Sequence, residues 1–235
     1  MLAIFKREFK AYFLSPIGYV FLTVFYFASN FFFYGNCITG NNANLNHVFS
    51  NLIIILIFII PALTMKLISE DKKLGTDQLL LTSPVKLSSI ILGKFFAALT
   101  TFFIGIAITF GYAILLSFFS HYDWISFLCN IIGLLLLGSA LISIGIFISS
   151  LTENQIISII SSFAIMLLLL LIETISMFIK TPLISKIISY ISIVNIYHQF
   201  TYGSFSLPNV ILFLGLITIF LFLTTRVLEK KRWSN

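Results

Sequence analysis

Long apolar runs without a single charged residue are the feature that most constrains this sequence. One covers residues 52–65 and another covers Phe95–Phe119. A helix needs about 20 such residues to cross the hydrocarbon core of a bilayer. The whole chain is 59% hydrophobic and 9% charged, which leaves too little polar surface to cover a soluble globule of 235 residues. Because lipid cannot hydrogen-bond to the backbone, the sequence predicts an all-α, polytopic membrane protein.

The apolar runs predict six transmembrane helices in a single transmembrane domain over residues 1–235. The predicted spans are Ile17–Tyr34, Val48–Leu67, Ile90–Phe119, Trp124–Ser150, Ile156–Ile179 and Asn209–Val227. Residues 1–14 set aromatic side chains on one face and basic ones on the other, which is typical of a helix lying on the membrane surface. Residues 180–208 are too short and too polar on one face to span, so we expect an interfacial or re-entrant segment there.

Small residues in the third and fourth predicted spans indicate close helix packing. In the third span they recur every four residues, at Ala97, Thr101, Gly105 and Thr109. The fourth span mixes leucine with glycine and serine. In the second span, Pro61 lacks a backbone donor and predicts a kink. The first and fifth spans, richer in large aromatic residues or leucine, are the candidate contacts for a second copy or a paralogue.

The distribution of basic residues predicts the orientation. Twelve of the 14 Lys and Arg residues fall in the N-terminal segment, in the loop after the second span with Lys66 before it, or in the C-terminal tail, and the other two are Lys180 and Lys186. By the positive-inside rule, both termini and that loop are cytosolic. The basic residues are spread through short segments, so nucleic acid is not an expected partner.

The loop Ser69–Lys94 holds most of the charge in the interior of the chain. Its middle predicts a short helix that Thr76 could cap and that carries Leu79–Leu81. Gly75 would let the chain turn into this helix, and Pro84 would end it, because proline disfavours helical geometry at the preceding Ser83. A capped, leucine-bearing helix between two spans is suited to docking on a protein outside the membrane.

Several of these motifs together resemble the permease subunit of type-2 ABC transporters. The resemblance rests on the N-terminal helix ending in Ser15-Pro16, on residues 70–84 (EDKKLGTDQLLLTSP) and on Gly93-Lys94, and it covers almost the whole chain. The C-terminal residues 227–233 are similar to the branch that includes the gliding-motility and nitrous-oxide-reductase maturation permeases.

This resemblance implies a bacterial inner-membrane permease, with export as the commoner direction in the family. It would pair with a second permease and with cytosolic ATPase subunits that bind ATP and magnesium, and membrane lipids would surround it. The loop after the second span would be the coupling element. Its expected contact residues are Glu70, Asp71, Gly75, Thr76, Leu79, Leu80, Ser83 and Pro84.

The chain itself carries no recognisable catalytic or phosphate-binding motif. Gly93-Lys94 lacks the preceding glycine and the following Ser or Thr of a phosphate-binding loop, so we interpret Lys94 as a snorkelling lysine at a helix start. No Gly-x-Ser-x-Gly motif occurs. The three histidines have no metal-ligand spacing, so no metal or cofactor is expected in this chain. Whether Cys37 and Cys129 pair is left open.

Glu173 is the only acidic residue inside a predicted span, which makes it a candidate gating or substrate residue. Its place near the outer end of the fifth span also fits a residue at the membrane interface. Two other functions stay open. One is an assembly or maturation factor that handles haem or a metal cluster without true transport. The other is an ion-coupled secondary transporter, although that class normally carries intramembrane charges and internal repeats.

Overall fold

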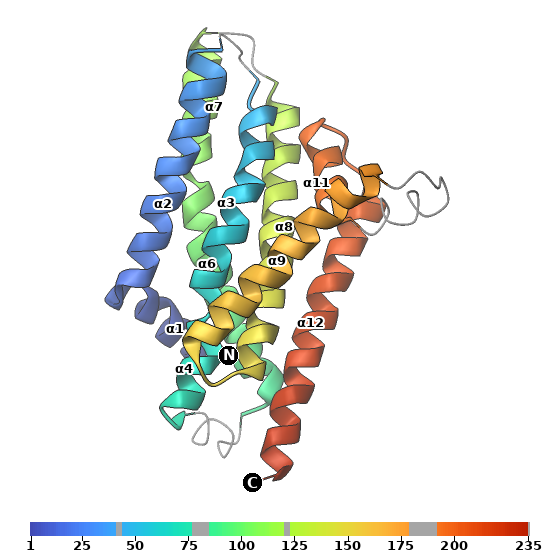
Figure 1. Cartoon of the computed structure of the whole chain (residues 1–235). Helices are drawn as coiled ribbons and strands as arrows, with labels where there is room; N and C mark the ends of the chain where they lie inside the picture. The colour runs from blue at the N-terminus through green and yellow to red at the C-terminus, as the bar shows by residue number, and fades with distance from the viewer. Residues whose placement is uncertain (41–43, 77–84, 120–122, 179–191, 235) are drawn as a thin grey trace.

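The computed structural model describes residues 1–40, 44–76, 85–119, 123–178 and 192–234. The described helices form one bundle in which most run roughly along a common axis and α9 crosses this axis obliquely (Figure 1). Their bounds are α1 Leu2–Leu14, α2 Pro16–Phe33, the π-helix η1 Tyr34–Ile38, α3 Asn46–Thr64, α4 Lys66–Lys73, α6 Leu87–Ile106, α7 Ile108–Phe119, α8 Trp124–Leu151, α9 Gln155–Phe178, α11 Ile193–Thr201 and α12 Leu207–Ser234.

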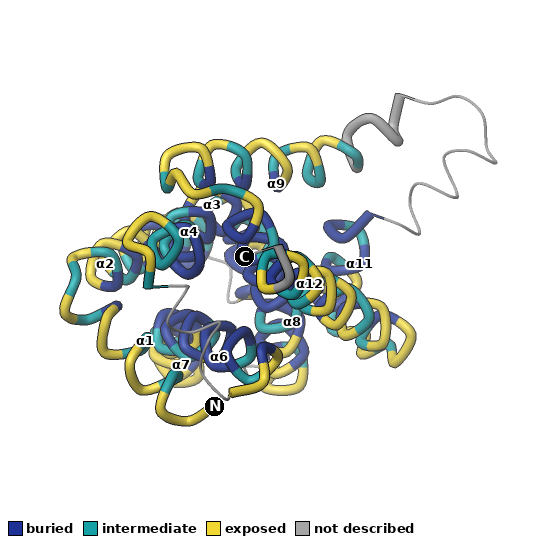
Figure 2. The backbone as a smooth tube through the Cα atoms, turned by 90° about the horizontal axis from the view of Figure 1, so that it is seen from below, coloured by how far each residue is buried: buried dark blue, intermediate teal, exposed yellow. Residues whose placement is uncertain are grey.

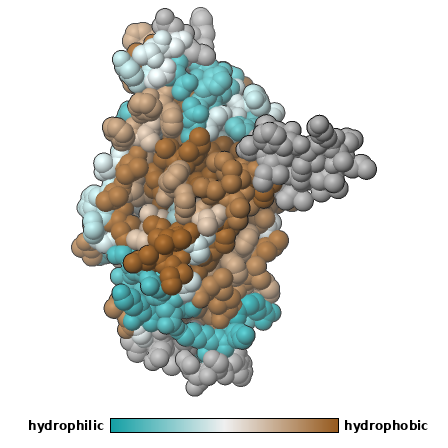
Figure 3. Space-filling model, viewed as in Figure 1, coloured by the Kyte–Doolittle hydropathy of each residue, from teal (hydrophilic) through white to brown (hydrophobic). Residues whose placement is uncertain are grey.

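Six helical stretches among these residues are long and apolar enough to cross a membrane. They are Pro16–Ile38, Asn46–Lys73, Leu87–Phe119, Trp124–Leu151, Gln155–Ile172 and Leu207–Arg232. The surface shows a broad hydrophobic band across the middle of the bundle, with hydrophilic residues gathered below it and at the upper end (Figure 3). The predicted all-α architecture with six spans is therefore confirmed, and the chain is a multi-pass membrane protein.

Helix α8 is the centre of the bundle. It packs against α3, α6, α9, α11 and α12, and 78% of its most apolar window is buried. Small residues permit this packing: a Cβ atom added to Gly138 would lie 2.0 Å from the ring of Phe102 on α6, and one added to Gly145 would lie 2.2 Å from Thr64 Oγ1 on α3. The prediction that the fourth span packs inside a bundle is confirmed.

The small residues of the third span also face the interior. Ala97 and Thr101 are fully buried, and Thr109 is 1% exposed. The span is interrupted at Ala107, which separates α6 from α7. Helices α2 and α9, by contrast, expose many large apolar side chains, and α9 lies at the edge of the bundle (Figure 2).

Two helix boundaries differ from the sequence prediction. The second predicted span ends at Leu67, whereas helix α3 ends at Thr64 and the interruption falls at Met65. Helix α3 continues through Pro61, and the kink expected there stays a prediction. The C-terminal residues from Arg226, predicted as a basic tail, extend α12 to Ser234, because no glycine or proline stops the helix and Arg226 pairs with Glu229 one turn later, at 3.0 Å. Helix α1 has the predicted bounds, while its position on the membrane surface stays a prediction.

Candidate functional site at the α4 end of the bundle

The two chain ends, α1 and α4 lie at the same end of the bundle (Figure 1). Helix α4 continues the second span after a break at Met65, and a buried serine of α8 stabilises this break. Ser149 Oγ accepts hydrogen bonds from the backbone N–H groups of Ile68 (3.2 Å) and Ser69 (3.1 Å). It also donates to the carbonyl oxygen of Met65 at 3.0 Å. These bonds satisfy amides that the break leaves without helical partners, so α4 is fixed to α8.

Lys94 lies at the centre of a buried group of charges beside α4. Its side chain is 4% exposed, although it belongs to an otherwise apolar helix. The ammonium group donates to Glu8 Oε1 on α1 at 2.9 Å, to Asp71 Oδ2 on α4 at 2.6 Å and to the carbonyl oxygen of Leu67 at 2.5 Å. An ammonium group has three donors, so these three contacts use all of them.

Arg7 completes this group, which we call the Lys94 cluster and which comprises Arg7, Glu8, Asp71 and Lys94. Arg7 lies 2.5 Å from Glu8 Oε1 and 3.7 Å from Asp71 Oδ2, so the cluster has two cations and two anions. Thr76 Oγ1 donates to Asp71 Oδ1 at 2.9 Å. Both oxygens of Asp71 therefore have partners within the chain, and the buried charges are balanced.

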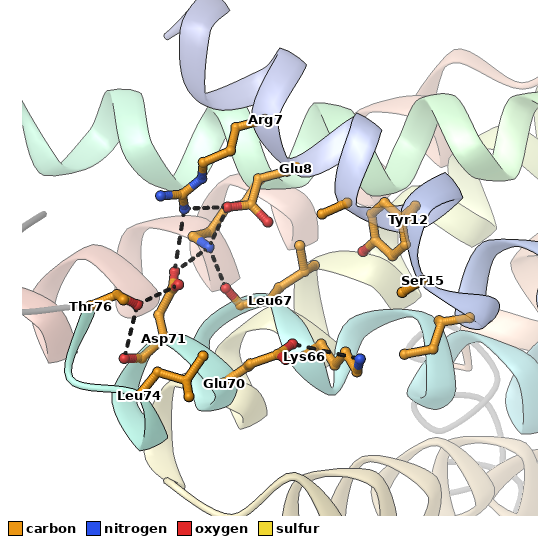
Figure 4. Close-up of a pocket in the computed structure, with 13 residues that line it drawn as sticks. Arg7, Glu8, Tyr12, Ser15, Lys66, Leu67, Glu70, Asp71, Leu74 and Thr76 are labelled. Carbon is orange, nitrogen blue, oxygen red and sulfur yellow. Dashed lines mark hydrogen bonds and ion pairs between the residues drawn. The ribbon is translucent and has the colours of Figure 1, made fainter.

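A cavity of about 310 Å³ opens beside the cluster, between α1, α4 and the start of α2 (Figure 4). Tyr12 is buried in its wall and donates to the carbonyl oxygen of Leu63 at 2.8 Å. Burial, together with the negative charge of Glu8, raises the pKa of the Tyr12 hydroxyl well above its usual range. The hydroxyl therefore stays protonated and keeps its hydrogen bond at physiological pH.

The end of α4 has the turn that the sequence indicated. Gly75 has φ +70°, a left-handed conformation that L side chains rarely adopt, and an added Cβ would meet no atom within 4 Å. The only cost of a side chain there would be backbone strain. Glu70 points away from the Lys94 cluster and pairs with Lys66 one turn earlier on α4, at 3.8 Å. Its side chain is 37% exposed.

Part of the predicted coupling segment lies outside the described residues. These positions are Asp77, Leu79, Leu80, Ser83 and Pro84, and with them the predicted capped helix. The predicted re-entrant segment is described only from residue 192 onward, where α11 is buried against α8. Glu173 belongs to α9, but its side chain lies outside the described part of the structure.

The sequence analysis missed Glu8 and misinterpreted Lys94. We expected Lys94 to snorkel into water, and the structure corrects this, since its ammonium is buried and fully paired. The sequence did hold a signal. A lone lysine inside an apolar span is costly in lipid unless it has a partner, and the acidic residues nearest to it along the chain are Asp77, Asp71 and Glu70, all in the preceding loop.

Other kinds of site find no support within the described residues. No group of three or more His, Cys, Asp or Glu side chains is placed to hold a metal ion there. Cys37 and Cys129 are both buried, free thiols. The cluster itself is an arrangement of ion pairs that joins α1, α4 and α6.

Comparison with known families settles the class of this protein. The family described as "ABC-2 family transporter protein" matches residues 3–233, which is nearly the whole chain. The chain belongs to this family. It is therefore a membrane component of an ABC transporter, and membership implies an ABC ATPase subunit as its partner. No protein among the curated ones matches the chain.

Proposed function

We propose that this chain is the permease subunit of a bacterial ATP-driven exporter, in which separate cytosolic ATPase subunits bind ATP and magnesium and act on the loop 69–94. The observation that carries the proposal is the placement of α4. Helix α4 extends the second span as a charged helix at the end of the bundle where both chain ends lie. It contacts α8, and its Asp71 belongs to the Lys94 cluster. A displacement of this loop would reach several spans at once.

The proposed orientation puts this end of the bundle in the cytosol of a bacterial cell with the protein in its inner membrane. Twelve of the 14 Lys and Arg residues lie in the segments assigned to the cytosol, as the positive-inside rule requires. Single cysteines at Lys73 and Ser234, in a background without Cys37 and Cys129, should resist an impermeant thiol reagent added to intact cells. Cysteines at Asn42 and Ser206 should react. Labelling at position 73 from outside would overturn the orientation.

The ATPase contact is proposed to centre on Leu79 and Leu80. Truncation of an interface anchor typically costs about 1–4 kcal/mol, while charges at the rim of an interface mainly change association rate and salt dependence. The double variant Leu79→Ala/Leu80→Ala should lose co-purification of the ATPase while it still inserts into the membrane. Gly75→Val should mimic it by misdirecting the chain, and Glu70→Gln should have less effect. Full ATPase binding by the double alanine variant would exclude this contact.

A second permease copy or paralogue is proposed to cover α2 or α9. Both helices belong to candidate spans and expose large apolar side chains, such as Phe27 (74%) and Ile160 (62%). Native mass spectrometry of the intact complex should find two permeases for each pair of ATPase subunits. The sequence of residues 227–233 favours the gliding-motility or nitrous-oxide-reductase maturation branch as the process served, and the genes beside this one would test that assignment.

A further inference from the structure

Helix α4 is connected to its neighbours in two different ways. It packs mainly on α8, with smaller contacts on α9 and α3. Toward α6, the polar contacts among the described residues come from one side chain, since Lys94 donates to the Leu67 carbonyl and to Asp71 of α4. Lys94 is the eighth residue of α6. The third span is thus held to α4 at a point two turns inside the helix.

Helix α1 does not depend on Lys94 in the same way. It packs closely on α6 over much of its length. Ile4 contacts the buried pair Leu87 and Ile90, and the Cβ position of Gly93 lies 3.1 Å from Ile4 Cγ2. The Glu8–Lys94 ion pair therefore adds to an apolar contact that would hold α1 on α6 without it. The packing between α4 and α6, which the Asp71–Lys94 pair joins, is much sparser than the packing between α1 and α6.

A buried ion pair of this kind resists separation. If α4 moved away from α6, Lys94 would lose two of its three acceptors at a position where its side chain is only 4% exposed, and an uncompensated charge there is unfavourable. It is less costly for α6 to move with α4. Arg7, Glu8 and Thr76 also face these two groups. Arg7 and Glu8, on α1, and Thr76, just after α4, hold the Asp71 carboxylate and the Lys94 ammonium in place. None of these three residues belongs to α6.

We propose that Lys94 is a positioning residue that makes the third span follow α4, through its ion pair with Asp71. The proposal rests on the function proposed above, because it takes the ATPase as the source of the α4 movement. A purely structural role for the cluster would predict a different result. Loss of the ion pair would then lower stability but leave the movement of α6 unchanged in the molecules that remain folded.

The experiment measures the two movements separately in the permease–ATPase complex in nanodiscs. Spin labels at Lys73 and Leu168 measure the distance between the end of α4 and α9. Labels at Phe96 and Leu168 measure the distance between α6 and α9, which lies on the other side of the bundle (Figure 2). All labelled proteins lack Cys37 and Cys129. Distances are recorded with and without ATP, in a complex whose ATPase cannot hydrolyse it.

In the parent protein, ATP should shift both distances. Asp71→Asn should keep the shift between positions 73 and 168 and lose the shift between positions 96 and 168. Glu70→Gln is the matched control, because it removes a carboxylate from the adjacent position of the same helix without touching Lys94. Any weakening of the ATPase contact by this change would lower both shifts together, so the ratio between the two shifts should stay that of the parent protein. Glu8→Gln should keep both shifts, given the apolar contact between α1 and α6.

The triple variant Glu8→Gln/Asp71→Asn/Lys94→Met guards against misfolding, since it removes the buried ammonium together with both of its carboxylates and leaves only the half-exposed Arg7 without its partners. It should fold and still lose the α6 shift. An α6 shift of parental size in Asp71→Asn or in the triple variant would overturn the role of Lys94. Failure of the parent protein to bind an ATPase, or to move at position 73 with ATP, would instead refute the proposed function.

Discussion

The two ends of the bundle are held together by different polar contacts. At the α4 end, neutral hydrogen bonds such as those of Ser149 and Tyr12 are joined by ionic contacts, with Lys94 between two carboxylates. At the opposite end, the buried contacts are neutral. Asn130 donates to Asn46 at 2.8 Å, and Tyr197 donates to the carbonyl oxygen of Phe49 at 3.0 Å. All ion pairs among the described residues belong to the α4 end.

This difference shows at which end of the bundle the polar contacts are strong and depend on one another. A neutral hydrogen bond contributes about 0.5–1.5 kcal/mol net, and its loss affects two groups. An ion pair with a buried member resists the removal of one partner more strongly, because the remaining charge is poorly solvated. The α4 end therefore responds as a unit, while contacts at the opposite end can change one at a time.

The largest effect is expected for Lys94→Met. It leaves Glu8 and Asp71 facing each other with only Arg7 to compensate, so we expect a loss of about 3–5 kcal/mol of stability. Reversible unfolding in mixed detergent micelles would measure it. The triple variant described above should recover most of this loss. If Lys94→Met unfolds like the parent protein, the buried ion pairs do not hold this end together.

A smaller effect is expected for Asn130→Ala at the opposite end. The side chain is 1% exposed, and its removal deprives Asn46 Oδ1 of its donor, which should cost about 1–3 kcal/mol. The same unfolding assay applies. A loss as large as that of Lys94→Met would mean that the neutral contacts at this end also act as a unit, and the contrast between the two ends would fail.

Tyr12→Phe and Tyr197→Phe test whether a neutral contact behaves alike at both ends. Each tyrosine is buried and donates to one carbonyl oxygen of α3. Each variant should lose about 1 kcal/mol. A clearly larger loss for Tyr12→Phe would show that the nearby Lys94 cluster depends on its hydroxyl, which would sharpen the comparison.

The smallest effect should appear only through pH, at the exposed start of α8. Asp123 caps this helix, and hydrogen bonds from the Ser126 side chain and backbone, with a further one from the Ile125 backbone, lower its pKa. A lowered pKa means that the cap stabilises above the usual pKa of aspartate and loses its contribution as the pH falls through the lowered value. Asp123→Asn should flatten this dependence in thermal unfolding scans. An unchanged pH profile would contradict the role of Asp123.

Much of the arrangement followed from local sequence patterns. Ser15-Pro16 separated α1 from α2, the turn before Gln155 separated α8 from α9, and Gly75 was expected in a turn, where it has φ +70°. In these cases the deciding physics is local, because a proline ring, a polar gap or a left-handed residue acts on its own backbone. The packing of the third and fourth spans also followed from small residues at helical spacing.

The sequence by itself determined that this chain is a six-span helical membrane protein, because apolar length and hydrogen-bond satisfaction in lipid leave few other solutions. Only the tertiary structure decided which charges are buried together. Glu8, Asp71 and Lys94 are far apart in the chain, and no local pattern distinguishes Asp71, which meets Lys94, from Glu70, which pairs within its own helix. An ion pair depends on distances of a few ångströms between separate helices, and those distances are set by how α1, α4 and α6 pack.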